Sequence, residues 1–147
     1  MAFTDRLRQQ HDLATIMTDH LRNLVRRDRP GDYAIEIATQ LARLLNVLQI
    51  HLAEEDEYLY PTLIAIEDRN AAALAQRYQL EMGSLASNLE DFMQRWSSSA
   101  VIALNFAAFK IALDLLLGAL LARIECENAT LYPIADALIA DVRDKAA

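Results

Sequence analysis

The chain has 147 residues and a formal net charge of −7 at neutral pH. Such an acidic surface repels nucleic acid and anionic membranes, so we expect neither as a partner. Only three glycines and three prolines occur, too few for a turn-rich β protein, and the abundance of alanine and leucine favours helices.

Cysteine usage and the N-terminal residues indicate the compartment. The single cysteine, Cys126, excludes an internal disulfide and is typical of a reducing environment. Residues 1–10 lack the apolar core of a signal peptide. We therefore expect a cytoplasmic protein, and the length predicts one domain that spans residues 1–147.

Four long helical patterns follow one another along the chain. We expect helices over about 4–27, 32–58, 70–96 and 100–128, with Thr4 as a plausible N-cap of the first. The segment RDRPGD (27–32) ends the first helix, Pro61 ends or kinks the second, residues 97–99 end the third, and a short C-terminal helix begins at Pro133. The pattern predicts an all-α, antiparallel up-down four-helix bundle with a short C-terminal helix.

The most apolar stretch, residues 100–122, mimics a membrane span. It carries Asn105, Lys110 and Asp114, which share one polar stripe on a helix. A charge at mid-bilayer costs about 2.5–3.5 kcal/mol, so we expect a buried bundle helix instead. Its long apolar surface leaves room for a helix-packed homodimer.

Two segments of the chain are nearly repeats of each other, offset by 72 residues. They are HLAEEDEYLYP at 51–61 and RIECENATLYP at 123–133. The second copy keeps the glutamate and the Leu-Tyr-Pro end of the first. It has Arg123 where the first has His51.

Polar residues of the repeat interrupt apolar stripes of the second and fourth helices. His51 and Glu55 lie at i and i+4, a spacing that lets one helix offer two ligands to one metal ion. Glu127 occupies the matching depth in the fourth helix. A buried carboxylate must be paired, protonated or metal-bound, so the pattern predicts a polar centre inside the bundle.

Further ligands are expected from the first and third helices. His11 and His20 both flank the apolar face of the first helix, and the pattern alone does not choose between them. The stripe of the third helix is almost wholly apolar, but Glu81 lies at its edge beside Met82 and is a further candidate carboxylate.

These features resemble the hemerythrin-like family, also called the HHE cation-binding domain. The resemblance rests on His-x-x-x-Glu followed by Leu-aromatic-Pro at 51–61, on the altered copy at 123–133, and on LRQQHDLATI at 7–16, which selects His11 over His20. It covers nearly the whole chain. It implies a four-helix bundle around a non-haem di-iron site, with each iron held by histidines of two helices and with carboxylates of the second and fourth helices bridging the irons.

Compared residue by residue with that pattern, the chain retains only one half of the implied di-iron site. His11, His51, Glu55 and Glu127 match, whereas the second half has Met82 and Arg123 where histidines are implied. We therefore expect one iron, manganese or zinc ion, or none if the site is degenerate. Arg123 would then compensate the charge of the two carboxylates in place of the second metal.

Four other side chains are expected to have mainly structural roles. Tyr60 and Tyr132 mark the repeat and are expected to be packing aromatics whose hydroxyls could reach the site. Cys126 is expected to be a packed thiol, and Met82 a core methionine.

The resemblance implies proteins that bind or sense oxygen, sense iron, handle nitric oxide or store metal. We expect a hemerythrin-like binding or regulatory protein with a reduced, single-metal or metal-free site and an unknown protein partner. The alternative is a non-haem di-iron or mono-iron protein that senses or handles oxygen, nitric oxide or peroxide. No Gly-rich phosphate loop or Ser-His-Asp set supports a hydrolase or kinase, and a non-enzymatic role is favoured without excluding an enzyme.

Overall fold

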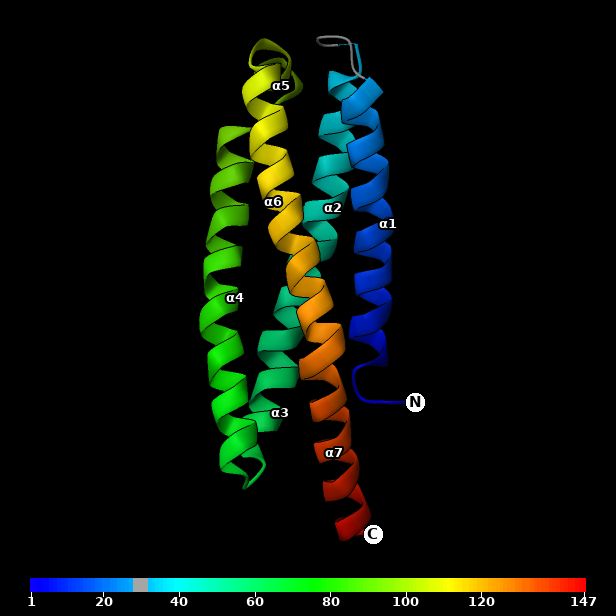
Figure 1. The fold of residues 1–147 in the computed structure, drawn as a ribbon, viewed down its shortest axis with the longest axis vertical. Coiled ribbons are helices and arrows are strands. Elements are labelled where there is room, and N and C mark those ends of the chain that lie inside the picture. The colour runs from blue at the N-terminus through cyan, green and yellow to red at the C-terminus, as the bar shows by residue number, and fades with distance from the viewer. Residues whose placement is uncertain (28–31) are drawn as a thin grey trace.

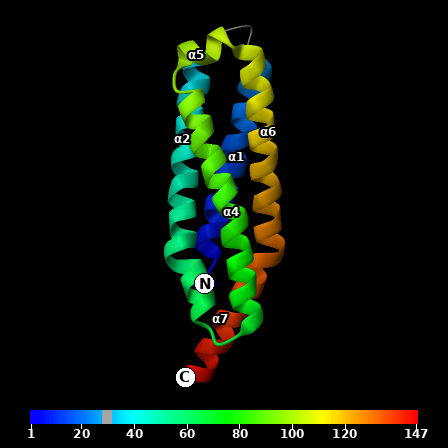
Figure 2. The ribbon, with the colours of Figure 1, turned by 90° about the vertical axis from the view of Figure 1, so that its left-hand side faces the viewer.

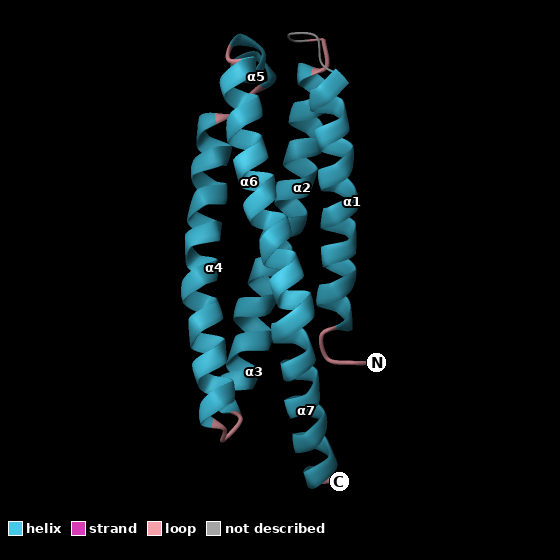
Figure 3. Ribbon diagram, viewed as in Figure 1, coloured by secondary structure: helices cyan, strands magenta, loops and turns pink. Residues whose placement is uncertain are grey.

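The computed structural model describes residues 1–27 and 32–147, which are helical almost throughout, as Figure 3 shows. The elements in chain order are α1 (Asp5–Arg27), α2 (Ala34–Glu54), the π-helical turn η1 (Glu55–Leu59), α3 (Tyr60–Ala65), α4 (Arg69–Arg95), α5 (Ser99–Leu104), α6 (Phe106–Cys126), the π-helical turn η2 (Glu127–Leu131) and α7 (Tyr132–Ala146). The described ranges contain no β-strand, so the predicted all-α class is confirmed.

The helices run alternately up and down (Figure 1). α1 rises from the N-terminus, α2 and α3 return, α4 rises again, and α6 and α7 descend to the C-terminus. Figure 2 shows the same four antiparallel rods from the side, with the end of α7 extending past the bundle. The predicted up-down four-helix bundle is therefore confirmed.

The first predicted break falls mostly outside the described residues. α1 ends at Arg27, as expected, and α2 begins at Ala34, but residues 28–31 of the RDRPGD segment are not described. Thr4 directly precedes α1, and its hydroxyl donates to Asp136 of α7 at 2.7 Å. This contact attaches the start of α1 to the last helix.

Pro61 does not end its helix, which differs from the prediction, whereas Pro133 lies at the start of the C-terminal helix as expected. Each lies in the first turn of a helix that continues directly from a π-helical turn, so α2 is continuous with α3 and α6 with α7. In each π turn a backbone N–H donates to a carbonyl five residues back, from Tyr60 to Glu55 and from Tyr132 to Glu127. We infer that the wider turn makes room for the proline ring, which would otherwise meet a carbonyl of the preceding turn.

The predicted fourth helix is interrupted near its start, at Asn105. This residue has φ −126° and ψ 39°, outside the helical range. Both its backbone N–H and its side-chain amide donate to the carbonyl of Val101, at 3.2 Å each. α5 therefore ends at Leu104, and α6 begins at Phe106.

Buried apolar side chains form two clusters along the bundle. The larger cluster fills the part of the bundle next to α5 and includes the aromatic residues Phe92, Trp96, Phe106 and Phe109. The smaller cluster contains Leu59, Leu131 and other residues of α3, α4 and α7. The polar residues of the repeat lie between the two clusters along their own helices, so apolar packing shields them on both sides.

No helix in the two described ranges is both long enough and apolar enough to cross a bilayer. The stretch that mimics a membrane span is α5 and α6, whose inner face packs into the larger cluster through Phe109, Leu113 and Leu117. The polar stripe that includes Lys110 and Asp114 is exposed.

Candidate metal centre

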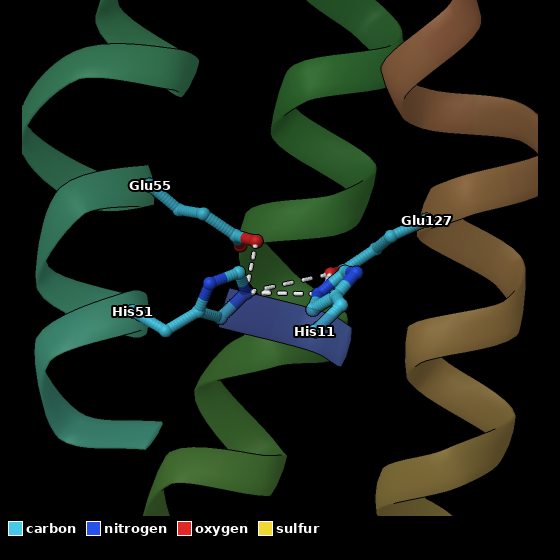
Figure 4. Close-up of side chains that lie close together, drawn as sticks. All are labelled: His11, His51, Glu55 and Glu127. Atoms are coloured by element: carbon cyan, nitrogen blue, oxygen red, sulfur yellow. Dashed lines mark hydrogen bonds and ion pairs between the residues drawn. The ribbon is translucent and has the colours of Figure 1, made fainter. Parts of the chain in front are cut away.

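Four side chains from three rods of the bundle meet between the two apolar clusters (Figure 4). His11 comes from α1, His51 from α2, and Glu55 and Glu127 open the two π turns. One ligand atom of each lies within 4.8 Å of the others, and no residue of this group is more than 3% exposed. Histidine nitrogens and carboxylate oxygens together form a donor set for a transition-metal ion.

Both histidines are oriented by side-chain amides. His51 Nδ1 is 2.7 Å from Gln10 Oε1, and His11 Nδ1 is 2.8 Å from Asn128 Oδ1. An amide oxygen accepts hydrogen bonds, so both Nδ1 atoms donate and both Nε2 atoms point into the centre. This arrangement, in which an outer partner fixes the tautomer of a ligand histidine, is typical of metal sites.

The two Nε2 atoms face each other at 3.0 Å. If both rings were neutral, two lone pairs would meet at this distance and repel. A cation must therefore be shared between them, either a proton or a metal ion. Burial alone would lower the pKa of His51, but its hydrogen bonds to Glu127 and Glu55 outweigh burial and raise the pKa to about 9. Without metal, His51 thus carries the proton at neutral pH.

The carboxylates have different partners on their two oxygens. Glu55 Oε1 is 2.7 Å from His51 Nε2 and accepts a hydrogen bond from Tyr132 at 2.7 Å, and Glu55 Oε2 accepts one from Tyr60 at 3.0 Å. Glu127 Oε2 lies 3.0 Å from His11 Nε2. Burial raises the pKa of Glu127, but hydrogen bonds to His11 and His51 outweigh it and hold the pKa well below its usual range. Glu127 is therefore ionised.

Both tyrosine hydroxyls of the repeat reach the centre. Burial first, and then the negative charges of Glu55 and Glu127, raise the pKa values of Tyr60 and Tyr132 above their usual range. Without a bound cation, both hydroxyls keep their protons and act as hydrogen-bond donors to Glu55.

Arg123 occupies the side of Glu127 that faces away from the histidines. Its Nε donates to Glu127 Oε1 at 2.7 Å, its Nη1 to Glu81 Oε2 at 2.9 Å, and its Nη2 to the Tyr78 carbonyl at 3.1 Å. The guanidinium also lies 4.5 Å from the centre of the Tyr78 ring. Burial alone would lower the pKa of Arg123, but the contact with Glu127 outweighs it, so the guanidinium stays charged.

The second carboxylate partner of Arg123 differs from the expected one. We expected Arg123 to compensate both Glu55 and Glu127, but in the structure it pairs with Glu127 and Glu81. The physical reason is that Glu55 already has both oxygens engaged, by Tyr60 on one side and by His51 and Tyr132 on the other.

The remaining candidates lie away from the ligand group. His20 is exposed on α1. The Glu81 side chain is 52% exposed and pairs with Arg123. Met82 is buried, as expected of a core methionine. Cys126 is exposed, so the expectation of a packed thiol is wrong. Its neighbour Glu127 faces inward, and successive positions of a helix point in different directions.

Sequence reasoning missed Gln10 and Asn128, which orient the two histidines. Each is the direct chain neighbour of a proposed ligand, Gln10 of His11 and Asn128 of Glu127. A polar residue beside an inward-facing one normally faces solvent, so this position gave little signal. There was also no sign in the sequence that Tyr78 contacts Arg123, although its carbonyl accepts a hydrogen bond from Arg123 and its ring packs on the guanidinium.

A small internal cavity of about 10 Å³ adjoins the centre. His11, His51, Arg123 and Glu127 line one side, and apolar side chains, mostly leucines, line the rest. This volume is close to the minimum for one water molecule. The space beside the histidines is thus enough for about one water molecule.

A comparison with protein families identifies the relationship. The family model described as the Hemerythrin HHE cation binding domain matches residues 2–135. The chain belongs to this family. Comparisons with curated proteins and with solved structures gave no match. The family resemblance expected from the sequence is therefore confirmed, and the buried histidines and glutamates of this hemerythrin-family bundle are compatible with a bound metal ion.

Proposed function

We propose that this hemerythrin-family protein binds a single metal ion through His11, His51, Glu55 and Glu127 and acts as a binding or regulatory protein. The observation that carries the proposal is the guanidinium of Arg123 on Glu127, at the position where a second ion would need that carboxylate. A carboxylate that bridges two ions uses both its oxygens. Here one oxygen of Glu127 faces His11 and the other accepts from Arg123.

The distances between the donor atoms are close to those expected around a single ion. Two donors that are each about 2.1 Å from an ion and separated by 90–110° lie about 3.0–3.4 Å apart. The His11 Nε2 atom is 3.0 Å from both His51 Nε2 and Glu127 Oε2, and His51 Nε2 is 2.7 Å from Glu55 Oε1. Small side-chain shifts therefore suffice to centre an ion among the four donors.

The donor types suit iron, manganese or zinc. Family membership favours iron among these. When bound, such an ion would supply Lewis acidity and, for iron or manganese, a change of oxidation state. The protein's own contribution is to hold the histidines in one tautomer through Gln10 and Asn128 and to exclude bulk water by burial.

A chain of charged contacts links the buried centre to the surface. Glu127 contacts both the histidines and Arg123, and Arg123 contacts Glu81, whose side chain is half exposed on α4. An ion bound at the centre would compete for the negative charge of Glu127 and weaken its hold on Arg123. We infer that metal occupancy is transmitted in this way to the packing of α4 against α6, where a protein partner could read it.

Elemental analysis of protein expressed with ample metal tests the proposal. We expect about one ion per chain in the wild type, strong loss of metal in His51→Ala, and retention in His20→Ala, a matched control with an exposed histidine. About two ions per chain would contradict the single-ion site.

The competing possibility is a bundle that no longer binds metal. It is favoured by one observation, that a proton on His51 completes the hydrogen-bond network without any ion. A wild-type content below roughly a tenth of an equivalent would establish this alternative and overturn our proposal.

A further inference from the structure

We propose that the hydroxyl oxygen of Tyr132 is a fifth ligand to the ion and binds it as a phenolate. The inference rests on the proposed function, because it requires an ion in the centre. It goes beyond the ligand set that the family resemblance implies, which consists of histidines and carboxylates.

The Tyr132 oxygen contacts a ligand atom of every member of the group. It lies 2.7 Å from Glu55 Oε1, 3.2 Å from His11 Nε2, 3.3 Å from Glu127 Oε2 and 3.4 Å from His51 Nε2. A hydroxyl that served only as a donor to Glu55 would need only the first of these contacts. Because the Tyr132 oxygen is close to all four donor atoms, it would face the same ion as they do.

These distances match those between ligands around one ion. Donors about 2.1 Å from a common ion are roughly 3.0–3.4 Å apart at angles of 90–110°. Three of the four Tyr132 distances fall in that range, and the fourth, to Glu55, is a hydrogen bond in the metal-free protein. An ion placed among the four side chains is therefore within bonding reach of the Tyr132 oxygen after a small shift.

The ring of Tyr132 is held in position. It is fully buried and stacks on the His11 ring, with centroids 5.1 Å apart and planes at 19°. The guanidinium of Arg8 lies 5.3 Å from the centre of the ring and also donates to the Asn128 carbonyl. These contacts fix the ring and hold its hydroxyl oxygen at the centre.

Tyr60, the counterpart of Tyr132 in the repeat, lacks this geometry. Its hydroxyl donates at 3.0 Å to Glu55 Oε2, whereas His51 contacts the other oxygen of that carboxylate. Tyr60 therefore only hydrogen-bonds to the proposed ligand Glu55 from outside the ligand group, whereas the Tyr132 hydroxyl lies among the proposed ligands. The two tyrosines have the same chemistry, the same burial and equivalent chain positions, so Tyr60 is a control within the molecule.

The proposed step is balanced without any redox partner. In the metal-free protein the Tyr132 O–H donates to Glu55. If an ion bound, His51 would release its Nε2 proton and the Tyr132 O–H bond would break; the tyrosine oxygen would keep the electron pair for the metal bond, and both protons would leave to solvent. A bound cation reverses the sign of the local field that otherwise keeps the hydroxyl protonated. Tyrosinate is an established protein ligand to iron.

The test loads metal-stripped protein with Fe²⁺ under anaerobic conditions and then oxidises it in air to Fe³⁺. A phenolate bound to Fe³⁺ gives a charge-transfer band in the visible region and tyrosinate modes in resonance Raman spectra. We expect both in the wild type and in Tyr60→Phe. We expect Tyr132→Phe to lose both while keeping about one iron per chain. A purely packing or hydrogen-bonding role for Tyr132 would produce no such signature.

Failure of this inference can be distinguished from failure of the proposed function. Stoichiometric iron without the band in the wild type, or a band that persists in Tyr132→Phe, overturns the Tyr132 assignment alone. An iron content below roughly a tenth of an equivalent in the wild type overturns the proposed function and this assignment with it. Because the wild-type spectra can overturn the assignment by themselves, it stays testable even if Tyr132→Phe folds poorly.

Discussion

The guanidinium of Arg123 supplies to Glu127 the positive charge that a second ion would supply. Unlike a metal ion it cannot dissociate from the protein, and its guanidinium stays protonated at every physiological pH. It also donates in a fixed plane, which ties Glu127 to the Tyr78 carbonyl of α4. Arg123 is thus a permanent structural contact between α6 and α4.

His51 gives the metal-free protein a pH-dependent stability. Its folded-state pKa is about 9, against an ordinary value of 6.5. Because the folded value is raised, the stabilising contribution is complete below pH 6.5 and is lost as the pH rises through about 9. We expect the free energy of unfolding of the chelator-treated protein to fall over this range by up to about 3 kcal/mol.

Urea unfolding of metal-free protein at several pH values measures this effect. His51→Gln should flatten the dependence between pH 6.5 and 9, whereas His20→Gln, which changes an exposed histidine, should keep it. A wild-type stability that is constant across this range would show that the ring is neutral in the folded protein.

At the scale of the helices, the two π turns place the repeat glutamates. Glu55 and Glu127 each open a π turn, and a proline follows in the first turn of the next helix. π turns often occur at functional sites because they change which way neighbouring side chains point. Here they leave the glutamate and the following tyrosine facing the same interior position.

Arg123 also links α6 to α4 through buried and half-buried contacts. In Arg123→Ala the ionised Glu127 would remain buried with one charge partner removed, so we expect the metal-free protein to lose about 3 kcal/mol of stability. Arg77→Ala is the matched control, since the Arg77 side chain is 62% exposed and its contact with Glu81 is 3.8 Å long. It should change stability by less than about 0.5 kcal/mol.

Unfolding of the wild type and of the two arginine variants in denaturant measures this change in the free energy of unfolding. If Arg123→Ala matched Arg77→Ala in stability, Arg123 would be an ordinary surface arginine and would not be the internal counter-ion of Glu127.

At the scale of the whole molecule, the centre is a polar layer between two apolar clusters, and three rods of the bundle contribute to it. An ion that binds only this folded arrangement stabilises the entire bundle, by about 2.7 kcal/mol at a free concentration 100 times Kd. For a chain of this length, we expect removal of the ion by a chelator to lower Tm by roughly 5–10 °C.

Thermal unfolding with and without chelator checks this expectation, and His51→Ala should show no chelator effect because it lacks a ligand. A wild-type Tm that does not respond to the chelator would mean that no ion contributes to the stability of the purified protein. The outer face of α6 exposes Ile111 and Leu115, and a homodimer through this face stays a prediction.

Much of the fold followed from local periodicity. The apolar spacing of the helices predicted the four-helix bundle, and the i, i+4 spacing of His51 and Glu55 placed both on one helical face. The positions at which the helices are interrupted were less predictable. Proline chemistry alone predicted an end or a kink at Pro61, but the chain continues through a π turn into α3. The interruption at Asn105 lies inside one continuous apolar pattern, so periodicity did not reveal it.

The sequence by itself determined the helical pattern, the family, and which residues of one helix share a face, because these depend on spacing along a single element. Only the tertiary structure decided that Arg123 pairs with Glu81 and not with Glu55, and that the Tyr132 hydroxyl lies among the four candidate ligands. The physical reason is that contacts between helices depend on how the rods are rotated and shifted against one another, which the packing of the two apolar clusters sets for the molecule as a whole.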